Sequence, residues 1–91
     1  MDSGNSSRTM DQRIFSLDLP VEAVSLYLLC CGLVDGGATV SAKNIIGMWN
    51  GTPDELTNAH KILEAKNIVI KILSDGEGHD MYRVMDADEW E

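Results

Sequence analysis

The side chains that most readily bind metal ions are two cysteines and two histidines. Cys30 and Cys31 are adjacent, whereas His60 and His79 lie far from them and from each other. Zinc sites in small domains use paired spacings such as Cys-x-x-Cys, and adjacent residues of a helix point about 100° apart. The spacing therefore favours two small buried cysteines and a partly buried core histidine at position 60, with no metal site and no cofactor.

The acidic side chains of one glycine-containing loop are the next candidates for chemistry. Asp75, Glu77 and Asp80 lie within seven residues. A calcium loop of the helix-loop-helix type needs a twelve-residue ligand pattern that ends in glutamate, and this loop lacks it. We predict a solvated turn. The sequence also contains no nucleophile beside a base and no catalytic pair of carboxylates, so we do not expect an enzyme.

Three polar residues have side chains suited to contacting nucleic acid. Asn58 carries an amide that can pair with adenine through two hydrogen bonds. Lys43 and Lys61 can contact phosphate groups, each adding affinity that weakens with salt. Ordinary solvated helix positions explain all three residues equally well, so both interpretations stay open.

The helix that would carry Asn58 and Lys61 has a complete start signal. Thr52 is a typical N-cap, Pro53 fits the first helical position, and Glu55 completes a capping box. Asn67 tolerates the left-handed conformation that often ends a helix. The apolar positions of this helix fall on one face at spacings of three and four: Leu56, Ala59 and Leu63.

Two further helices precede it. Pro20 fits the first turn of a helix that ends at Asp35-Gly36-Gly37. Residues 24–34 of this helix are apolar on most sides, which is typical of the central helix of a small domain. This run is about half the length that a membrane span requires, so we expect no membrane partner. Residues 38–40 are expected to form a short strand, and Ser41 to cap a second helix ending at Asn50-Gly51.

Two strands are expected after the helices, at residues 68–73 and 81–85. A turn centred near Glu77 would pair Lys71 with Arg83, Ile72 with Tyr82, and Ile70 with Val84. The side chains of Ile70, Ile72, Tyr82 and Val84 would then face the core. The outward side chains would form an apolar strip with two cations, here called the hairpin strip: Val69, Lys71, Leu73, Met81, Arg83 and Met85.

From about Pro20 to Met85 the chain resembles winged helix-turn-helix domains of small bacterial regulators and replication proteins. The residues that carry the resemblance are Val40-Ser41-x-x-x-Ile45-Ile46, Thr52-x-x-x-Leu56-x-x-Ala59-x-x-x-Leu63 and Lys66-Asn67-Ile68-Val69. The resemblance implies an α+β winged-helix fold: three helices, including a helix-turn-helix, and a C-terminal β-hairpin wing.

The resemblance also implies that the third helix is a recognition helix. Its outward residues would enter the major groove of double-stranded DNA: Pro53, Asp54, Thr57, Asn58 and Lys61. On this basis we expect a DNA-binding protein related to transcription, with Lys43, Thr57, Asn58 and Lys61 at the interface and a possible homodimer.

The charge distribution supports a different partner. The net charge is −8, and residues 74–91 carry seven acidic side chains against Arg83 alone. Carboxylates in the wing repel phosphate, and Asp54 and Glu55 oppose the positive end of the third helix. The alternative is a protein-interaction module that uses the hairpin strip and Trp90. Trp90 would fold back over the strip, dock into a partner or belong to a disordered tail.

The expected organisation is a disordered N-terminal tail at 1–13, a winged-helix domain at 14–85 and an acidic C-terminal tail at 86–91. The conformation of residues 14–17 is left open. Neighbouring cysteines do not make a disulfide framework, and the start of the chain lacks a secretory pattern. We therefore expect a cytoplasmic location.

Overall fold

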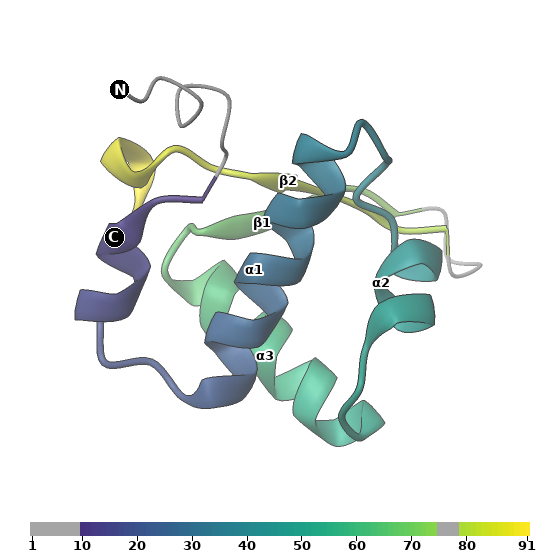
Figure 1. Ribbon diagram of the computed structural model, residues 1–91, viewed down its shortest axis with the longest axis horizontal. Coiled ribbons are helices and arrows are strands. Elements are labelled where there is room, and N and C mark those ends of the chain that lie inside the picture. The colour runs from purple at the N-terminus through teal and green to yellow at the C-terminus, as the bar shows by residue number, and fades with distance from the viewer. Residues whose placement is uncertain (1–9, 75–78) are drawn as a thin grey trace.

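The computed structural model describes residues 10–74 and 79–91 (Figure 1). Three α-helices come first and a two-stranded antiparallel hairpin follows them, so the predicted α+β class is confirmed and the arrangement is consistent with a winged-helix layout. Short 3-10 helices flank this unit. In chain order the elements are η2 (Gln12–Ser16), α1 (Val21–Asp35), α2 (Ala42–Met48), α3 (Pro53–Ala65), β1 (Val69–Leu73), β2 (Met81–Val84) and η3 (Ala87–Glu89).

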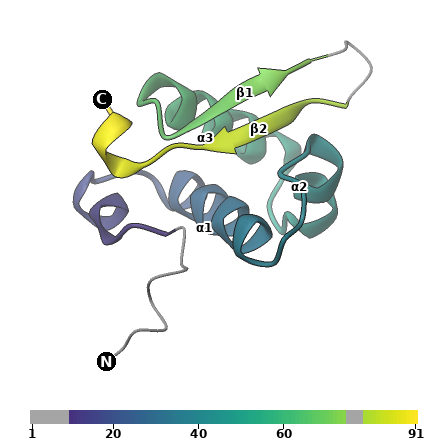
Figure 2. The same ribbon diagram turned by 90° about the horizontal axis from the view of Figure 1, so that it is seen from above.

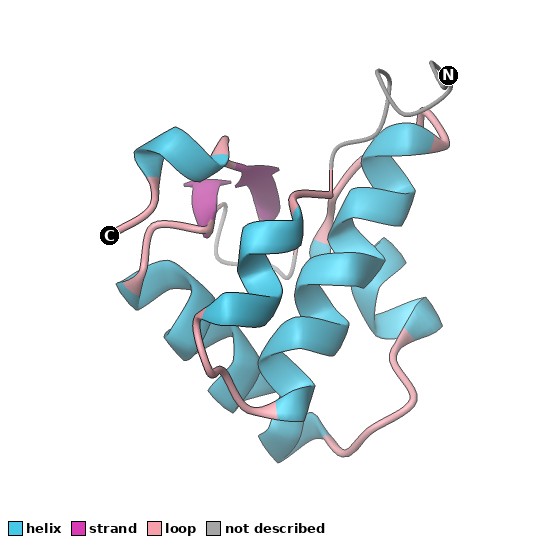
Figure 3. Ribbon diagram, turned by 60° about the vertical axis from the view of Figure 1, so that its left-hand side comes forward, coloured by secondary structure: helices cyan, strands magenta, loops and turns pink. Residues whose placement is uncertain are grey.

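The hairpin and α1 lie on opposite sides of the molecule, with α2 at one end (Figure 2). Helices account for most of the ribbon, and the two short strands lie beside them (Figure 3). The core between these layers is made of buried apolar side chains from the three α-helices and β1, including Leu26, Tyr27, Ile45, Leu63 and Val69. Helix α1 contributes to this core as expected for a central helix, but only one side of it does so, and the helix is not buried on every side.

The predicted helix ends are confirmed where local side chains make them. The Ser41 hydroxyl accepts a hydrogen bond from the Asn44 amide at 3.1 Å. Thr52 and Glu55 form the reciprocal capping box, with distances of 2.9 and 3.1 Å. Asn67 has a φ of 60°, the left-handed conformation expected after α3. By contrast, α1 begins after Pro20, which makes no side-chain capping bond.

The predicted pairing of the two strands is wrong by one residue. Val69 pairs with Val84, Ile70 with Arg83, Lys71 with Tyr82, and Leu73 with Met81. The register shifts between Lys71 and Leu73, so Ile72 is the extra residue of a β-bulge. A one-residue shift moves side chains to the opposite face of a strand. Val69 is accordingly fully buried, whereas Ile72, expected in the core, is 55% exposed.

The short strand expected at 38–40 is reduced to one bridge beside β2. Ser41 pairs with Met81 as an isolated antiparallel bridge. The Tyr82 amide donates to the Val40 carbonyl and the Ala42 amide to the Asp80 carbonyl, each at 2.8 Å. This segment therefore covers the edge of β2 that does not face β1.

Residues 10–13, expected to belong to the N-terminal tail, lie against the domain. Residues 1–9 lie outside the described residues, but the 3-10 helix η2 begins at Gln12 and buries Ile14 completely. Asp11 caps this helix through the Arg13 amide at 2.9 Å, and its own amide donates to the Tyr27 hydroxyl at 2.9 Å. These contacts place Asp11 and Arg13 against the domain, which composition alone did not indicate.

Candidate interaction surfaces

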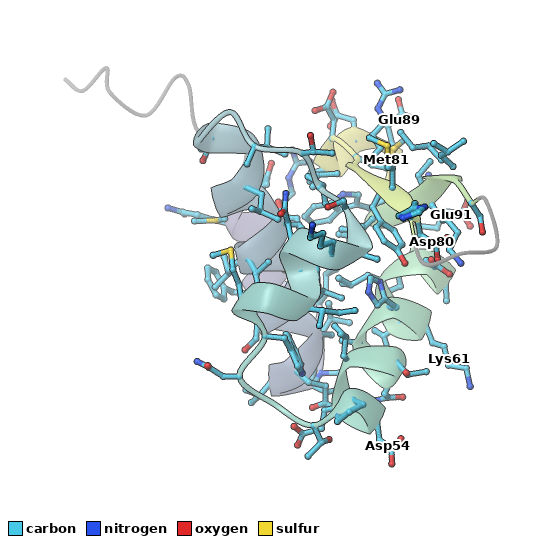
Figure 4. The ribbon with its side chains drawn as sticks, turned by 90° about the vertical axis from the view of Figure 1, so that its right-hand side faces the viewer. Asp54, Lys61, Asp80, Met81, Glu89 and Glu91 are labelled. Carbon is cyan, nitrogen blue, oxygen red and sulfur yellow. The ribbon has the colours of Figure 1, made fainter. Side chains whose placement is uncertain are left out.

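The four residues expected to contact DNA are all exposed. Lys43 lies on α2, whereas Thr57, Asn58 and Lys61 lie on α3. Lys61 and Asp54 both project away from the molecule on the outer side of α3 (Figure 4). The structure thus presents the expected residues to solvent, but it places a carboxylate on the same helix face as the lysine.

Two of these residues already have partners within the domain. The Asn58 amide nitrogen donates to the Glu22 carboxylate of α1 at 3.0 Å. The Thr57 hydroxyl donates to the Pro53 carbonyl at 3.1 Å. A base contact through Asn58 would replace the bond to Glu22 and leave that carboxylate close to the DNA. DNA binding by this face stays a prediction.

A polar cluster lies between α3 and the hairpin. The His60 and Tyr82 rings stack with centroids 4.7 Å apart, and the Lys71 ammonium lies 3.4 Å from the Asp80 carboxylate. Burial lowers the pKa of His60, and the nearby Lys71 lowers it further, while Asp80 opposes the shift. The buried His60 Nδ1 has no hydrogen-bond partner among the described residues. The cluster therefore disfavours the protonated form of His60, and the partly buried ring agrees with the expected core position.

The hairpin strip is not assembled as predicted. Leu73 and Arg83 are exposed as expected, and Met81 and Met85 are half-buried. Val69 is in the core, whereas Lys71 is exposed as expected. The bulge at Ile72 accounts for the burial of Val69, because it reverses the facing of β1 before that residue. The acidic residues Asp75 and Glu77 of the predicted turn lie outside the described residues.

Trp90 folds back onto the domain, but not over the hairpin strip. Its ring meets Tyr27 edge to face at a centroid distance of 5.6 Å, and its indole nitrogen donates to the Met85 carbonyl at 3.0 Å. The tail is also held at the turn after α3, where Asn67 donates to the Glu89 carbonyl at 2.9 Å and Glu91 to the Lys66 carbonyl at 2.8 Å. Trp90 is therefore a packing residue here.

The two cysteines are buried in the core as expected. Burial raises the pKa of Cys30 to about 12 and that of Cys31 to about 11. Both thiols are consequently protonated near neutral pH and poorly nucleophilic. In the residues that the structure describes, no group of three or more potential metal ligands is present.

An exposed apolar face of α1 was missed by the sequence interpretation. Val21 is 79% exposed, Leu28 is 39% exposed, and Ser25 and Gly32 are also exposed. These four residues recur at spacings of four, three and four, so they share one side of the helix, here called the α1 face. The sequence does show that this helix is apolar on most sides. That pattern was interpreted as a helix buried within the domain, so its exposed side was not predicted.

A groove borders the α1 face on the side of α2. It has a volume of about 420 Å³, and its lining is mixed: the apolar side chains of Val21, Leu29, Met48 and Trp49 lie beside the polar Glu22, Ser25, Asn50 and Glu55. The indole nitrogen of Trp49 donates to the Thr52 carbonyl at 3.1 Å, which holds the ring at the junction of α2 and α3. Ile46 and Met48 of α2 are exposed as well. The apolar surface therefore continues from α1 towards α2.

A comparison of the chain with protein-family models, curated proteins and solved structures finds no match. Among the described helices, none has both the length and the apolar character needed to cross a membrane.

Proposed function

We propose that this domain is a protein-interaction module that binds a protein partner through the α1 face. The observation that carries the proposal is the exposure of apolar residues on a helix that is already apolar on its core side. Val21 and Leu28 are exposed on α1, and Glu22 is the one charged residue of the sequence between Val21 and Val34. Helices that are apolar all round are normally buried all round.

The adjoining surface supports this proposal. Met48 is 55% exposed beside the groove that Val21 and Leu29 line. Contiguous exposed apolar surface on a small protein commonly marks a site of association. Burying one leucine or methionine side chain contributes about 1.5–3 kcal/mol, so covering the α1 face and Met48 would be worth several such contributions before the cost of association.

Binding of double-stranded DNA by α3 is the second candidate. It is supported by the exposure of Lys43 and Lys61, both suited to phosphate. It ranks second because Asp54 and Glu55 sit in the first turn of α3 and Asn58 is bound to Glu22. A titration with a short duplex at low salt tests it. Loss of binding in a Lys43→Ala/Lys61→Ala variant would support DNA binding by this face. If the unmodified protein does not bind the duplex even at low salt, the DNA-binding proposal is wrong.

Site-specific photocrosslinking tests the proposed function directly. A photoreactive amino acid would replace Ser25 on the α1 face and, as a control, Leu73 on the exposed end of β1. We expect protein adducts from position 25, no matching adducts from position 73, and loss of the adducts when Leu28→Glu is added. Absence of adducts at position 25, or adducts that Leu28→Glu leaves unchanged, would overturn the proposal.

A further inference from the structure

We infer that the partner of the α1 face is a second copy of this chain, with the two α1 helices antiparallel about a twofold axis. This inference rests on the proposed function, because it names the partner of the same surface. It depends on the order of large and small residues along α1, on one glycine, and on where the acidic residues lie.

Large and small residues of the α1 face match when the second helix runs antiparallel. With the axis passing between Leu26 and Tyr27, Ser25 lies opposite Leu28 of the other copy, and Val21 lies opposite Gly32. Each pair joins a large side chain to a small one and occurs twice, as a twofold interface requires. A parallel arrangement would instead oppose Leu28 to Leu28 and Gly32 to Gly32, so that Gly32 would have no side chain filling the space beside it.

Gly32 gives an independent reason for a close neighbour. Glycine inside a helix is destabilising relative to alanine. A Cβ atom at Gly32 would meet nothing within 4 Å in the described chain, so packing within the domain does not require this glycine. A second helix could approach closely here, because the missing side chain leaves a notch that Val21 of the other copy would fill.

The charge distribution permits two copies to meet at this face despite a net charge of −8. None of the four residues of the α1 face is charged, and the neighbouring Glu22 bonds to Asn58 of α3. The hairpin, with its acidic Asp80, lies on the opposite side of the molecule (Figure 2). Asp35, seven residues after Leu28 on the same side of α1, would lie at the two ends of this interface. Two copies would therefore associate with carboxylates at its edge and none at its centre, and without bringing the hairpins together.

The segment before Met10 is a weaker occupant of the same face. Residues 1–9 contain Met1 as their single apolar side chain, together with serines, asparagine, threonine and charged residues. Such a segment offers little apolar surface to cover Val21 and Leu28. A second copy offers the same apolar residues in the matching order.

Sedimentation velocity of the purified full chain tests the inference. We expect a reversible dimer with a dissociation constant of roughly 10 µM, as is typical of a modest interface. The measurement should therefore span about two decades of protein concentration around this value. Leu28→Glu should weaken the dimer by about a hundredfold or more, because it would bury two carboxylates. A chain that stays monomeric throughout this range would overturn the inference.

Two glycine variants separate the interface from the fold. Gly32→Ala should raise the melting temperature of the monomer by roughly 3–6 °C, since alanine favours the helix, yet weaken dimerisation by about tenfold. Gly47→Ala is the matched control, because Gly47 is a helical glycine of α2 whose added Cβ also meets nothing within 4 Å. It should stabilise the monomer without changing dimerisation. A dimer indifferent to Gly32→Ala and Leu28→Glu would place the contact elsewhere and overturn the inference.

The direction of the two helices is tested by NMR, and the identity of the partner is tested by combining sedimentation with crosslinking. In a mixture of labelled and unlabelled chains, isotope-filtered NMR should show contacts between Ser25 and Leu28 of different copies, and Leu28–Leu28 contacts would instead indicate parallel helices. If the pure chain is monomeric while position 25 still crosslinks to a different protein, the dimer fails and the proposed function stands. If position 25 captures no protein, both fail.

Discussion

Helices α1 and α3 pack against each other but differ in how their outer sides meet water. α3 has a reciprocal capping box at Thr52 and Glu55 and a polar outer side that carries Asp54 and Lys61. α1 has no side-chain cap at Pro20, and its outer side presents Val21 and Leu28. The outer side of α3 is a polar surface suited to contact with water. The outer side of α1 instead exposes apolar side chains of the kind that normally lie in a protein interior.

This difference is why the function proposed above is not the one that the winged-helix resemblance implies. That resemblance directs attention to α3, where exposed polar residues would meet DNA. The exposed apolar residues direct attention to α1 instead, because polar residues on a helix surface need no partner to explain them. Four predictions test the contrast between the two helices and their surroundings, beginning with the largest expected effect.

The two sides of α1 should respond differently to the same truncation. Leu26 is fully buried and Leu28 is 39% exposed, two positions apart on one helix. Leu26→Ala should lower the free energy of unfolding by about 2–5 kcal/mol, because it leaves a cavity in the core. Leu28→Ala should lower it by less than about 1 kcal/mol in dilute monomer. Urea denaturation measures both, and equal losses would mean that the α1 face is packed within the chain.

Trp90 covers one edge of α1 next to Tyr27, so its removal should have the next largest effect. Trp90→Ala should lower the free energy of unfolding by about 2 kcal/mol, through lost apolar burial and the lost bond to the Met85 carbonyl. Asp88→Ala is the control from the same tail, since its ion pair with Arg13 is exposed and should contribute nothing measurable. Thermal melts at one protein concentration measure both variants. If Trp90→Ala melts at the same temperature as the unmodified chain, the tail contributes nothing to stability.

The cap of α3 should contribute less than the core. Thr52→Ala removes the acceptor for the Glu55 amide and should lower the free energy of unfolding by about 1 kcal/mol. Thr57→Ala is the matched control in the same helix, because its hydroxyl bonds back to Pro53 and alanine favours the helix interior. Its stability should stay equal or rise slightly. A Thr52→Ala variant as stable as Thr57→Ala would show that packing alone fixes the start of α3.

The smallest expected effect is a dependence of stability on pH at His60. Burial lowers the pKa of His60 in the folded protein, so the unfolded chain binds its proton first as the pH falls below the ordinary value of 6.5. Stability should therefore be full above this value and decline as the pH falls towards the folded-state pKa. His60→Gln should flatten the decline between about pH 7.5 and 5.5, where histidine titrates. Identical pH profiles for the two proteins would show that His60 is readily protonated in place.

The features that could be predicted from sequence are those set by a few neighbouring residues. Thr52, Pro53 and Glu55 define the start of α3 within four positions, and Asn67 ends it by its own backbone preference. The strand pairing could not be predicted in the same way. One bulged residue, Ile72, shifts β1 by one position, and its placement depends on how Val69 and Tyr82 pack against distant helices.

The candidate site shows the same division between local and distant determinants. The apolar character of α1 is visible in the sequence, but which side stays uncovered depends on where α3, η2 and the tail pack. Met10 and Trp90 both pack against the core from segments whose polar composition predicted tails. A single anchoring apolar residue within a polar segment is a weak signal, and local patterns do not show what it will contact.

The meeting of both ends of the described chain at Tyr27 has a kinetic consequence. Tyr27 accepts from Asp11 and packs on Trp90, and the neighbouring contact between Arg13 and Asp88 joins residues 75 positions apart. Contacts of such large sequence separation require the closure of nearly the whole chain, which is entropically unfavourable early in folding. We expect the Tyr27–Trp90 pair to form after the folding transition state. Weakening it should then accelerate unfolding and leave the refolding rate almost unchanged.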